Sequence, residues 1–412
     1  MHTLSMVFDA RRLRAALVVI TILAAFAGCG GLGARVDDTA QVDDAAIGPD
    51  GAPLSLDSAP IGLDAGAPQL DTGTGLELGI SETGNAEAGS STDTIPPSAD
   101  AGVATEAPAP PTATIVVLPD TQYYASTYPD VFTSQTSWIV EQKSALGIAA
   151  VLHVGDIVDD PNSAAQWTVA NAAMRQLDGL VPYVLVPGNH DTDAARNGSI
   201  DSYFPPTTMP WITGTMTDGQ IENNFALVDI GPQKWLVLGL EFGPRDAVLT
   251  WADAVLKAYP NLPAMIVTHA YLYSDGKRYD IAICGNDMNA KNYQYWIPQY
   301  YGYTASEGIN DGEQIWQKLI LPNSNVKLVF SGHMTGAARL SSARPDGSVV
   351  HQMLSDYQWF RIDKADYYGG GGYLRVLQFD YGKKEIRVAT YSPYLDQYLT
   401  DDPNQFRLDW NL

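Results

Sequence analysis

Residues that can bind metal ions follow several apolar, strand-like stretches of this sequence. In the clearest case, PYVLVPGNHDTD, β-branched residues end in Pro187 and Gly188, and a turn then presents polar side chains. The polar residues that follow such stretches are Asp120, Gln122, Asp156, Asp159, Asn189, His190, Asp191, His269 and His333. Because open α/β folds keep their sites at the carboxyl ends of their strands, we expect these side chains to converge.

Carboxylates, an amide oxygen and imidazoles that meet in one place can bind divalent transition metals. Asp156 has two oxygens and could bridge two ions, which would polarise a phosphoryl group and lower the pKa of a shared water for in-line attack. His190, beside Asn189, could then donate a proton to the leaving oxygen. Such a histidine needs a carboxylate to hold its tautomer, and Asp159 or Asp191 could supply it.

At these residues the sequence resembles the calcineurin-like metallophosphoesterases. The segments GDIVD, GNHD, TH and GH occur in the order typical of that family, over roughly residues 114–333. The resemblance implies a mixed α/β fold, a two-sheet β-sandwich flanked by helices. It also implies residue roles: Asp156 as bridging ligand, Asp120 and Gln122 in the first metal site, Asn189, His269 and His333 in the second, His190 as general acid, and Asp159 as its orienting partner.

The first metal site of the family is altered in this sequence. The family usually has Asp-x-His in its first motif, and Gln122 stands at the histidine position here. The family usually ends with Gly-His-x-His, and Thr335 stands at the second histidine. Amide and hydroxyl oxygens are harder and weaker ligands than imidazole. We therefore expect two divalent ions (Mn, Fe, Zn or Mg), of which the first is labile and favours Mg or Mn; an enzyme with one ion is the alternative.

A third difference bears on the substrate. The protein Ser/Thr phosphatases of the family carry an arginine directly after the second Asp of the GDxxD motif, where this chain has Asp160. A carboxylate there would repel a phosphomonoester dianion, so we expect a phosphodiester substrate. Arg245 is the first candidate for binding the phosphoryl group, and Arg339, Lys277 and Arg278 are the others.

Two other functions are compatible with the sequence. One is a phosphomonoesterase, including a protein phosphatase. The other is a non-catalytic surface lipoprotein that keeps the fold and binds a ligand in the cleft, and the replacements at Gln122 and Thr335 keep this alternative in consideration.

Residues 1–29 predict an export signal that resembles those of bacterial lipoproteins. Basic residues from Arg11 onward precede the apolar segment 15–27, which is short for a membrane span. The segment closes on Cys29, and in lipoprotein signals such a cysteine is lipidated. We expect an exported protein held by lipid at the membrane, on the periplasmic or surface face of an outer membrane; a plain signal peptide or short anchor is the alternative.

Composition divides the rest of the chain into a tether and a folded domain. Residues 30–112 are rich in Ala, Asp, Gly, Pro, Ser and Thr, with a single basic residue, Arg35. Such a segment cannot bury enough apolar surface to fold, so we expect a disordered acidic tether, followed by a metallophosphoesterase domain at 113–412. The net charge of −23 argues against a nucleic-acid partner. The two cysteines exclude a disulfide framework.

Within the domain, strand-like and helical segments alternate. Strands are expected at 114–119, 148–155 and 182–187 and in later strand-rich runs, and helices near 131–146, 163–178, 246–258 and 311–321. Residues 271–307 form an insertion rich in Tyr, Asn and Gly, expected near the mouth of the site. It is either a lid or a surface loop whose aromatic residues pack locally. His153 and His351 are expected to be structural.

Overall fold

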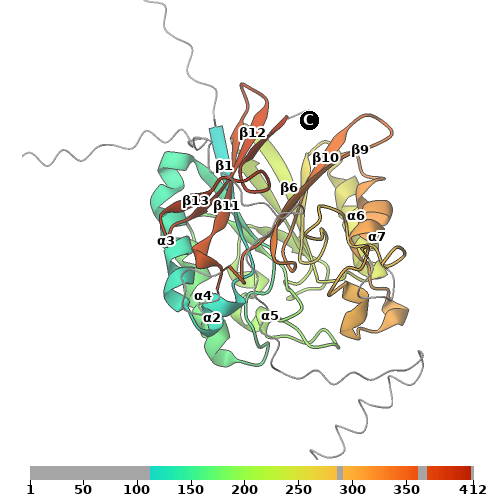
Figure 1. Ribbon diagram of the computed structural model, residues 1–412, viewed down its shortest axis with the longest axis horizontal. Helices are drawn as coiled ribbons and strands as arrows, with labels where there is room; N and C mark the ends of the chain where they lie inside the picture. The colour runs from blue at the N-terminus through green and yellow to red at the C-terminus, as the bar shows by residue number, and fades with distance from the viewer. Residues whose placement is uncertain (1–111, 285–290, 361–368, 410–412) are drawn as a thin grey trace, which may run out of the picture. The chain divides into compact units, whose positions relative to one another are not determined.

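Two β-sheets packed face to face form the core of the described part of the chain (Figure 1). The computed structural model describes residues 112–284, 291–360 and 369–409. The expected signal with Cys29, and residues 30–111 of the expected tether, lie outside the described residues, so their assignment stays a prediction. Within the described ranges, no helix is both long enough and apolar enough to cross a membrane.

The first sheet mixes parallel and antiparallel strands. Its order is β13 (Gln397–Leu399), β12 (Glu385–Ser392), β11 (Leu374–Asp380), β1 (Thr112–Leu118), β2 (Ile148–His153) and β3 (Tyr183–Leu185), and β14 (Phe406–Asp409) also pairs with β12. Strands β1, β2 and β3 run parallel, and β11 runs antiparallel to β1. Helices α3 (Pro129–Leu146) and α4 (Ala164–Met174) cover its outer face.

The second sheet has the same mixed character. Its order is β4 (Ile212–Thr215), β5 (Asn224–Ile230), β6 (Gln233–Leu240), β7 (Ala264–Thr268), β8 (Val326–Ser331), β10 (Val349–Asp356) and β9 (Gly336–Ala343). Strands β6, β7, β8 and β10 run parallel. Helix α6 (Asp246–Ala258), α7 (Gly312–Ile315) and the π-helical turn η5 (Trp316–Ile320) cover its outer face.

The side chains of β1 explain why this strand lies inside the fold. Ile115 and Val117 are fully buried between the two sheets, whereas Val116 and Leu118 are fully buried against the helices. Because successive side chains of a strand point to opposite faces, a strand covered on both faces must be apolar throughout. Burial of each such side chain contributes on the order of 2 kcal/mol.

The carboxyl ends of the parallel strands lie toward the same end of the sandwich, and the candidate ligands follow them. Asp120 follows β1, Asp156 follows β2, Asn189 follows β3, His269 follows β7 and His333 follows β8. The predicted fold class, two mixed sheets flanked by helices, is confirmed.

Several elements differ from the expected boundaries. The strand expected at 182–187 is reduced to β3, because Pro182 and Pro187 cannot donate ladder hydrogen bonds. The helix expected at 163–178 changes after Met174 to the 3-10 turn η1 (Arg175–Leu177). The helix expected at 311–321 is divided between α7 and the π-helical η5.

The sequence did not reveal some short elements. They are α2 (Gln122–Ser126), α5 (Ile200–Tyr203), the strands β4, β9, β13 and β14, and the 3-10 turns η2 (Pro206–Thr208), η3 (Pro298–Tyr301), η4 (Ala305–Glu307) and η6 (Gly370–Gly372). Most hold five residues or fewer, a length at which hydrophobic periodicity is hard to detect.

Candidate metal centre

The loop after β2 carries Asp156 in a backbone conformation that few residues adopt. Asp156 has a φ of 49°, and the preceding Gly155 has a φ of 99°. A Cβ on Gly188 would lie 2.0 Å from Oδ1 of Asp156, so only glycine leaves room for this carboxylate. The glycines of the GDIVD and GNHD motifs therefore allow two strand-end loops to touch.

Asp191 braces these two loops. Its carboxylate accepts hydrogen bonds from the backbone N–H groups of Ile157 at 2.9 Å, Val158 at 2.9 Å and Gly188 at 2.8 Å. Burial and the nearby Asp156 raise the pKa of Asp191 to about 6. Of the two carboxylates considered as partners of His190, Asp191 is thus the one that holds the backbone together.

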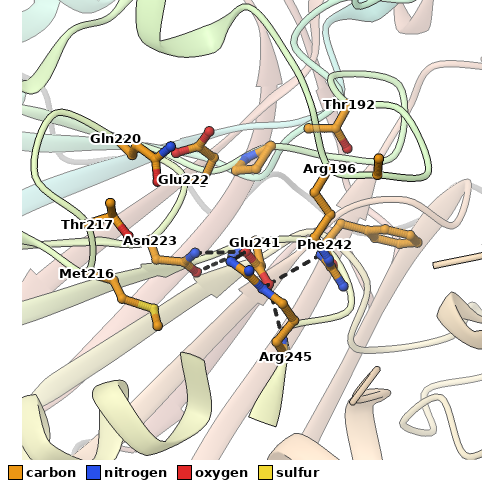
Figure 2. Close-up of a pocket in the computed structure, with 12 residues that line it drawn as sticks. Thr192, Arg196, Met216, Thr217, Gln220, Glu222, Asn223, Glu241, Phe242 and Arg245 are labelled. Atoms are coloured by element: carbon orange, nitrogen blue, oxygen red, sulfur yellow. Dashed lines mark hydrogen bonds and ion pairs between the residues drawn. The ribbon is translucent and has the colours of Figure 1, made fainter. Parts of the chain in front are cut away.

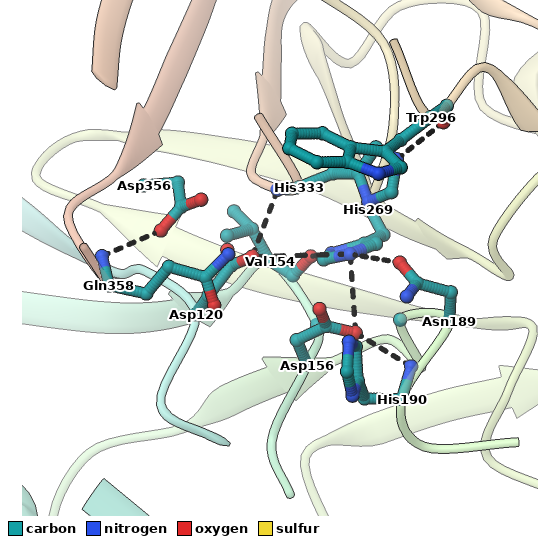
Figure 3. A network of polar contacts seen from close by, with 12 residues as sticks. Asp120, Val154, Asp156, Asn189, His190, His269, Trp296, His333, Asp356 and Gln358 are labelled. Carbon is teal, nitrogen blue, oxygen red and sulfur yellow. Dashed lines mark hydrogen bonds and ion pairs between the residues drawn. The ribbon is translucent and has the colours of Figure 1, made fainter. Parts of the chain in front are cut away.

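His269 lies in the middle of the cluster of candidate ligands (Figure 3). Its Nδ1 donates a hydrogen bond to the backbone carbonyl oxygen of Val154 at 2.8 Å, so Nε2 carries the lone pair of the neutral imidazole. Nε2 lies 3.1 Å from Oδ1 of Asn189 and 3.2 Å from Oδ1 of Asp156. It also lies 4.0 Å from Oδ2 of Asp120. A lone pair that faces only acceptor oxygens fits a cation between them.

His333 approaches from the second sheet and has a φ of 73°. Its backbone N–H donates to Oδ2 of Asp120 at 3.0 Å, and its Nε2 donates to the carbonyl oxygen of Trp296 at 2.7 Å, which leaves Nδ1 for a metal. The candidate ligand atoms of Asp156, His269 and His333 all lie within 4.8 Å of one another. Burial and the neighbouring His269 lower the pKa of His333 to about 3, which keeps the imidazole neutral as a ligand must be.

The charges of the cluster call for a positive group at its centre. Burial by itself would raise the pKa of Asp156, but His269 and His190 together hold it below its ordinary value. The same contact outweighs burial at His269 and raises the pKa of its imidazole. Positive charge is therefore favoured beside Asp156, and either an imidazolium or a bound ion supplies it.

The part of the centre expected to hold the first ion consists of oxygen atoms. Asp120 and Gln122 are almost fully buried, and Oδ1 of Asp120 and Oε1 of Gln122 have no hydrogen-bond partner among the residues that the structure describes. A buried polar atom without a partner costs about 1–3 kcal/mol, and a cation would satisfy both oxygens. The hydroxyl of Thr335 donates to Oδ2 of Asp356 at 3.4 Å. A Cβ on Gly332 would lie 2.0 Å from Oδ1 of Asp120.

His190 lies beside the cluster with its side chain 38% exposed. Its backbone N–H donates to Oδ1 of Asp156 at 2.9 Å. Its Nδ1 donates to the backbone carbonyl oxygen of Asp159 at 3.0 Å and lies 3.4 Å from the Asp159 carboxylate. Burial would lower the pKa of His190, but these two aspartates raise it. Asp159 therefore orients the ring through its backbone as well as its side chain, and Nε2 is left to carry the exchangeable proton.

The order and geometry of these ligands are those of a known family. Residues 113–335 match the family model described as calcineurin-like phosphoesterase. The chain belongs to the calcineurin-like phosphoesterase family. The resemblance drawn from GDIVD, GNHD, TH and GH is confirmed.

Two proteins are similar to this chain in sequence. The uncharacterized protein YvnB of Bacillus subtilis is 33% identical over 324 residues, which are 74% of this chain and 22% of YvnB. The probable inactive purple acid phosphatase 1 of Arabidopsis thaliana is 25% identical over 257 residues, which are 53% of this chain and 39% of that protein. The chain therefore spans less than half of the length of each relative.

Solved structures resemble this calcineurin-like phosphoesterase at low sequence identity. A dimetal phosphatase from Danio rerio has a TM-score of 0.45 at 12% identity, covering 73% of this chain and 99% of that one. The purple acid phosphatase PPD1 of yellow lupin (Lupinus luteus) has a TM-score of 0.43 at 14% identity, covering 73% of this chain and 54% of that one.

A pocket beside the candidate metal centre is lined by Arg245 among other residues (Figure 2). Figure 2 shows Glu241 between two arginines. The guanidinium of Arg245 donates to both carboxylate oxygens of Glu241, at 2.8 and 2.9 Å, and Arg196 lies 3.3 Å from the same carboxylate. Phe242, which also lines the pocket, has its ring 5.6 Å from that of His269. The sequence thus located Arg245 near the site but not the carboxylate that it shares with Arg196.

The other basic residues considered for the substrate are each paired with an acid. Arg339 lies 2.6 Å from Asp402, Lys277 lies 2.7 Å from Asp275, and Arg278 lies 2.6 Å from Glu313. The side chain of Asp160 accepts a hydrogen bond from the backbone N–H of Asn162 at the start of the loop before α4.

The described part of the insertion at 271–307 packs locally and also contacts the candidate metal centre. Tyr279 and Ile297 are fully buried in a small core with Phe242, as for a locally packed loop. Trp296 is 41% exposed, its ring contacts that of Trp359 at 5.4 Å, and its carbonyl accepts the bond from His333. The insertion is therefore part of the wall of the metal centre.

Two histidines outside the cluster have structural contacts. His153 is fully buried and accepts a hydrogen bond from Gly155 N–H at Nδ1 (3.2 Å), so its Nε2 donates to Thr121 at 2.9 Å. His351 contacts Ser341 at 2.8 Å and the carbonyl oxygen of Asp409 at 3.3 Å. Both agree with the expected structural role.

Two residues of the centre escaped the sequence interpretation. Asp356 ends the apolar run SVVHQMLSD just as Asp120 and Asp156 end theirs, so the same strand-end signal could have found it. Trp296 contributes a backbone carbonyl, which any residue type could supply, and no sequence signal identifies it.

Proposed function

We propose that this protein is a metal-dependent phosphoesterase that hydrolyses a phosphodiester, with His190 as the general acid. The observation that carries the proposal is the contact between the ligand cluster and His190. The backbone N–H of His190 donates a hydrogen bond to the bridging-ligand candidate Asp156, and the imidazole ring of His190 is partly exposed beside the cluster.

Different side chains would bind the ions and transfer the proton in this reaction. Asp156, Asn189, His269 and His333, together with Asp120, would hold the ions, which when bound polarise the phosphoryl group and lower the pKa of a water. A water at that position would lose one proton to solvent and form the new P–O bond as the P–O bond to the leaving group breaks. His190 transfers the proton on Nε2 to the leaving oxygen, and its Nδ1–H stays on the carbonyl oxygen of Asp159 throughout.

Two observations support a diester over a monoester. Asp160 stands where the protein phosphatases carry an arginine. In the adjoining pocket, Glu241 offsets part of the positive charge of Arg196 and Arg245. A monoester dianion needs more positive charge than a diester anion.

Comparing a diester with a monoester tests this preference. The purified protein would be loaded in turn with Mn, Mg, Zn and Fe and assayed on bis-para-nitrophenyl phosphate and para-nitrophenyl phosphate. We expect a higher kcat/KM for the diester with at least one of these metals. A higher value for the monoester with every metal would identify a phosphomonoesterase instead.

A non-catalytic binding protein is the second candidate, and one observation favours it. Gln122 and Thr335 replace both expected imidazoles of the first metal site. The variants H190A and D156N separate the two candidates. If neither change lowers the rate of phosphodiester hydrolysis below that of the wild type, the activity does not come from this centre and the binding function is preferred.

The N-terminal sequence supports an extracytoplasmic location for this activity. We propose that the chain is exported, lipidated on Cys29 and held at the outer membrane, so that it meets phosphate esters outside the cytoplasm. Replacing the cysteine by serine (C29S) in the producing bacterium should move the protein from the membrane fraction to the soluble fraction. A C29S protein that stays in the membrane fraction would show that lipidation is not the anchor.

A further inference from the structure

The carboxylate of Asp356 enters the metal centre from a strand that carries none of the family motifs. Asp356 is the last residue of β10 and pairs across the sheet with Gly336, the residue after Thr335. It is fully buried, and its Oδ2 accepts the hydrogen bond from the hydroxyl of Thr335. Thr335 stands where the family has an imidazole, so Asp356 reaches the region that this imidazole would fill.

The hydrogen bonds of Asp356 differ from those of the structural carboxylate Asp191. The carboxylate of Asp191 accepts hydrogen bonds from backbone N–H groups of two loops. Asp356 accepts one backbone hydrogen bond, from Gln358 at 2.9 Å, and the longer bond from Thr335 at 3.4 Å. A carboxylate has about four acceptor positions, so Asp356 keeps capacity for a further partner.

Other buried oxygens without partners lie in the same part of the centre. Oδ1 of Asp120, Oε1 of Gln122 and Oε1 of Gln358 are buried and make no hydrogen bond within the described part of the chain. Figure 3 shows Asp120, Asp356 and Gln358 close together. Buried carboxylates at such close quarters call for a cation between them.

We propose that Asp356 is a ligand of the first ion and replaces the missing imidazole, completing an all-oxygen site with Asp120, Asp156 and Oε1 of Gln122. The inference rests on the proposed function in that both require the metal pair of the family. Oxygen ligands alone favour hard cations such as Mg²⁺ and Mn²⁺, whereas the neighbouring site with its two imidazoles favours Zn²⁺ or Fe²⁺. The protein therefore holds two different metals.

Metal counting on an isosteric variant tests the proposal without an activity assay. The full chain would be stripped with a chelator and titrated with Mn²⁺, with free Mn²⁺ followed by electron paramagnetic resonance and bound metal by elemental analysis. We expect two ions in the wild type and one in D356N. The lost site should weaken by more than about 100-fold, because changing a group that only holds a ligand already costs 10–100-fold.

A carboxylate at the other end of the strands provides the matched control. Asp380 is mostly buried at the end of β11, opposite Thr112 at the start of β1, and pairs with Lys383. D380N should bind two ions with wild-type affinity. Metal-free D356N should melt no lower than the metal-free wild type, because the change removes a buried charge that is repelled by its neighbours.

Competition between metals supplies a readout that needs no variant. With equimolar Mn²⁺ and Zn²⁺, the wild type should take up one ion of each. Two zinc ions, a wild type that binds a single ion, or a folded D356N with two unweakened Mn²⁺ sites would each overturn the proposal for Asp356. A wild type that binds no metal would overturn the proposed function as well, so the two failures are distinguishable.

Discussion

The two halves of the metal centre lie at the same sheet edges but have very different candidate ligands. In one half, Asn189 and His269 come from motif positions, and the lone pair of the imidazole faces oxygens at 3.1 and 3.2 Å. In the other half, Asp120 and Gln122 present oxygens that have no partner, and Asp356 arrives from β10. Family motifs thus account for the half that contains His269. In our proposal the half that contains Gln122 is completed by Asp356 from the neighbouring strand β10.

Breaking the link between the halves should have the largest effect. Asp156 is the residue expected to contact both ions, and D156N removes its charge while keeping its shape. We expect both ions to be lost, each weakened by well over about 100-fold, and phosphodiester hydrolysis to fall to background. Elemental analysis and an assay with bis-para-nitrophenyl phosphate check this. Retention of either ion at wild-type affinity would show that Asp156 is not shared.

Removing the proton donor should lower the rate but leave both halves loaded. H190A is expected to reduce kcat by about 10²–10⁴-fold, because His190 protonates the leaving oxygen, and to keep the wild-type metal content. The control is H351A, since His351 bonds Ser341 and the carbonyl oxygen of Asp409 away from the cluster. Equal rates for H190A and H351A would exclude the assigned role.

Substituting a glycine by alanine adds one methyl group next to the ligands of each half. In G332A the new Cβ would lie 2.0 Å from Oδ1 of Asp120, and in G188A it would lie 2.0 Å from Oδ1 of Asp156. G332A should weaken the first ion about 10–100-fold and spare the second, whereas G188A should weaken both. Mn²⁺ titration measures this, and identical losses in the two variants would mean that the halves are not separable.

The smallest effect concerns a partly buried carboxylate outside the centre. Burial and the nearby Asp201 raise the pKa of Glu222 to about 7, so the folded protein holds this proton more tightly than the unfolded chain. The stability that protonation gives is complete below about pH 4 and is lost as the pH rises to 7. Relative to the wild type, E222Q should therefore gain about 2 kcal/mol in free energy of unfolding between pH 4.5 and pH 8.

Urea unfolding of both proteins at the two pH values checks this last expectation. A difference between E222Q and the wild type that does not change with pH would show that Glu222 needs no compensation where it lies. Of the described carboxylates compared here, only the buried acids of the metal centre would then have a charge that must be balanced by a cation.

The sequence was most informative where one strand or helix determines the outcome. The helix expected at 246–258 has those bounds in the structure, because its apolar spacing and the acid at its start are local features. The candidate ligands His269 and His333 could be proposed from the sequence because each comes just after an apolar strand. Such positions then come together because the carboxyl ends of parallel strands lie at the same edge of a sheet.

The rest depends on contacts between segments that are distant in the chain. Asp356 is read as a ligand only once β10 is known to lie against β9, with Asp356 opposite Gly336. The pairing of Arg245 with Glu241 requires the turn between β6 and α6. Strand β9, with the sequence GAARLSSA, was not expected because its small and polar residues lack apolar alternation.

The hydrogen bond from His333 ends on the main chain at Trp296, and a main-chain carbonyl is the same whatever side chain the residue carries. Mutation can therefore exchange the aromatic groups around this position without disturbing the bond that orients the imidazole. The bond that positions His333 thus depends on the path of the main chain, whereas the partly exposed indole of Trp296 can change independently of it.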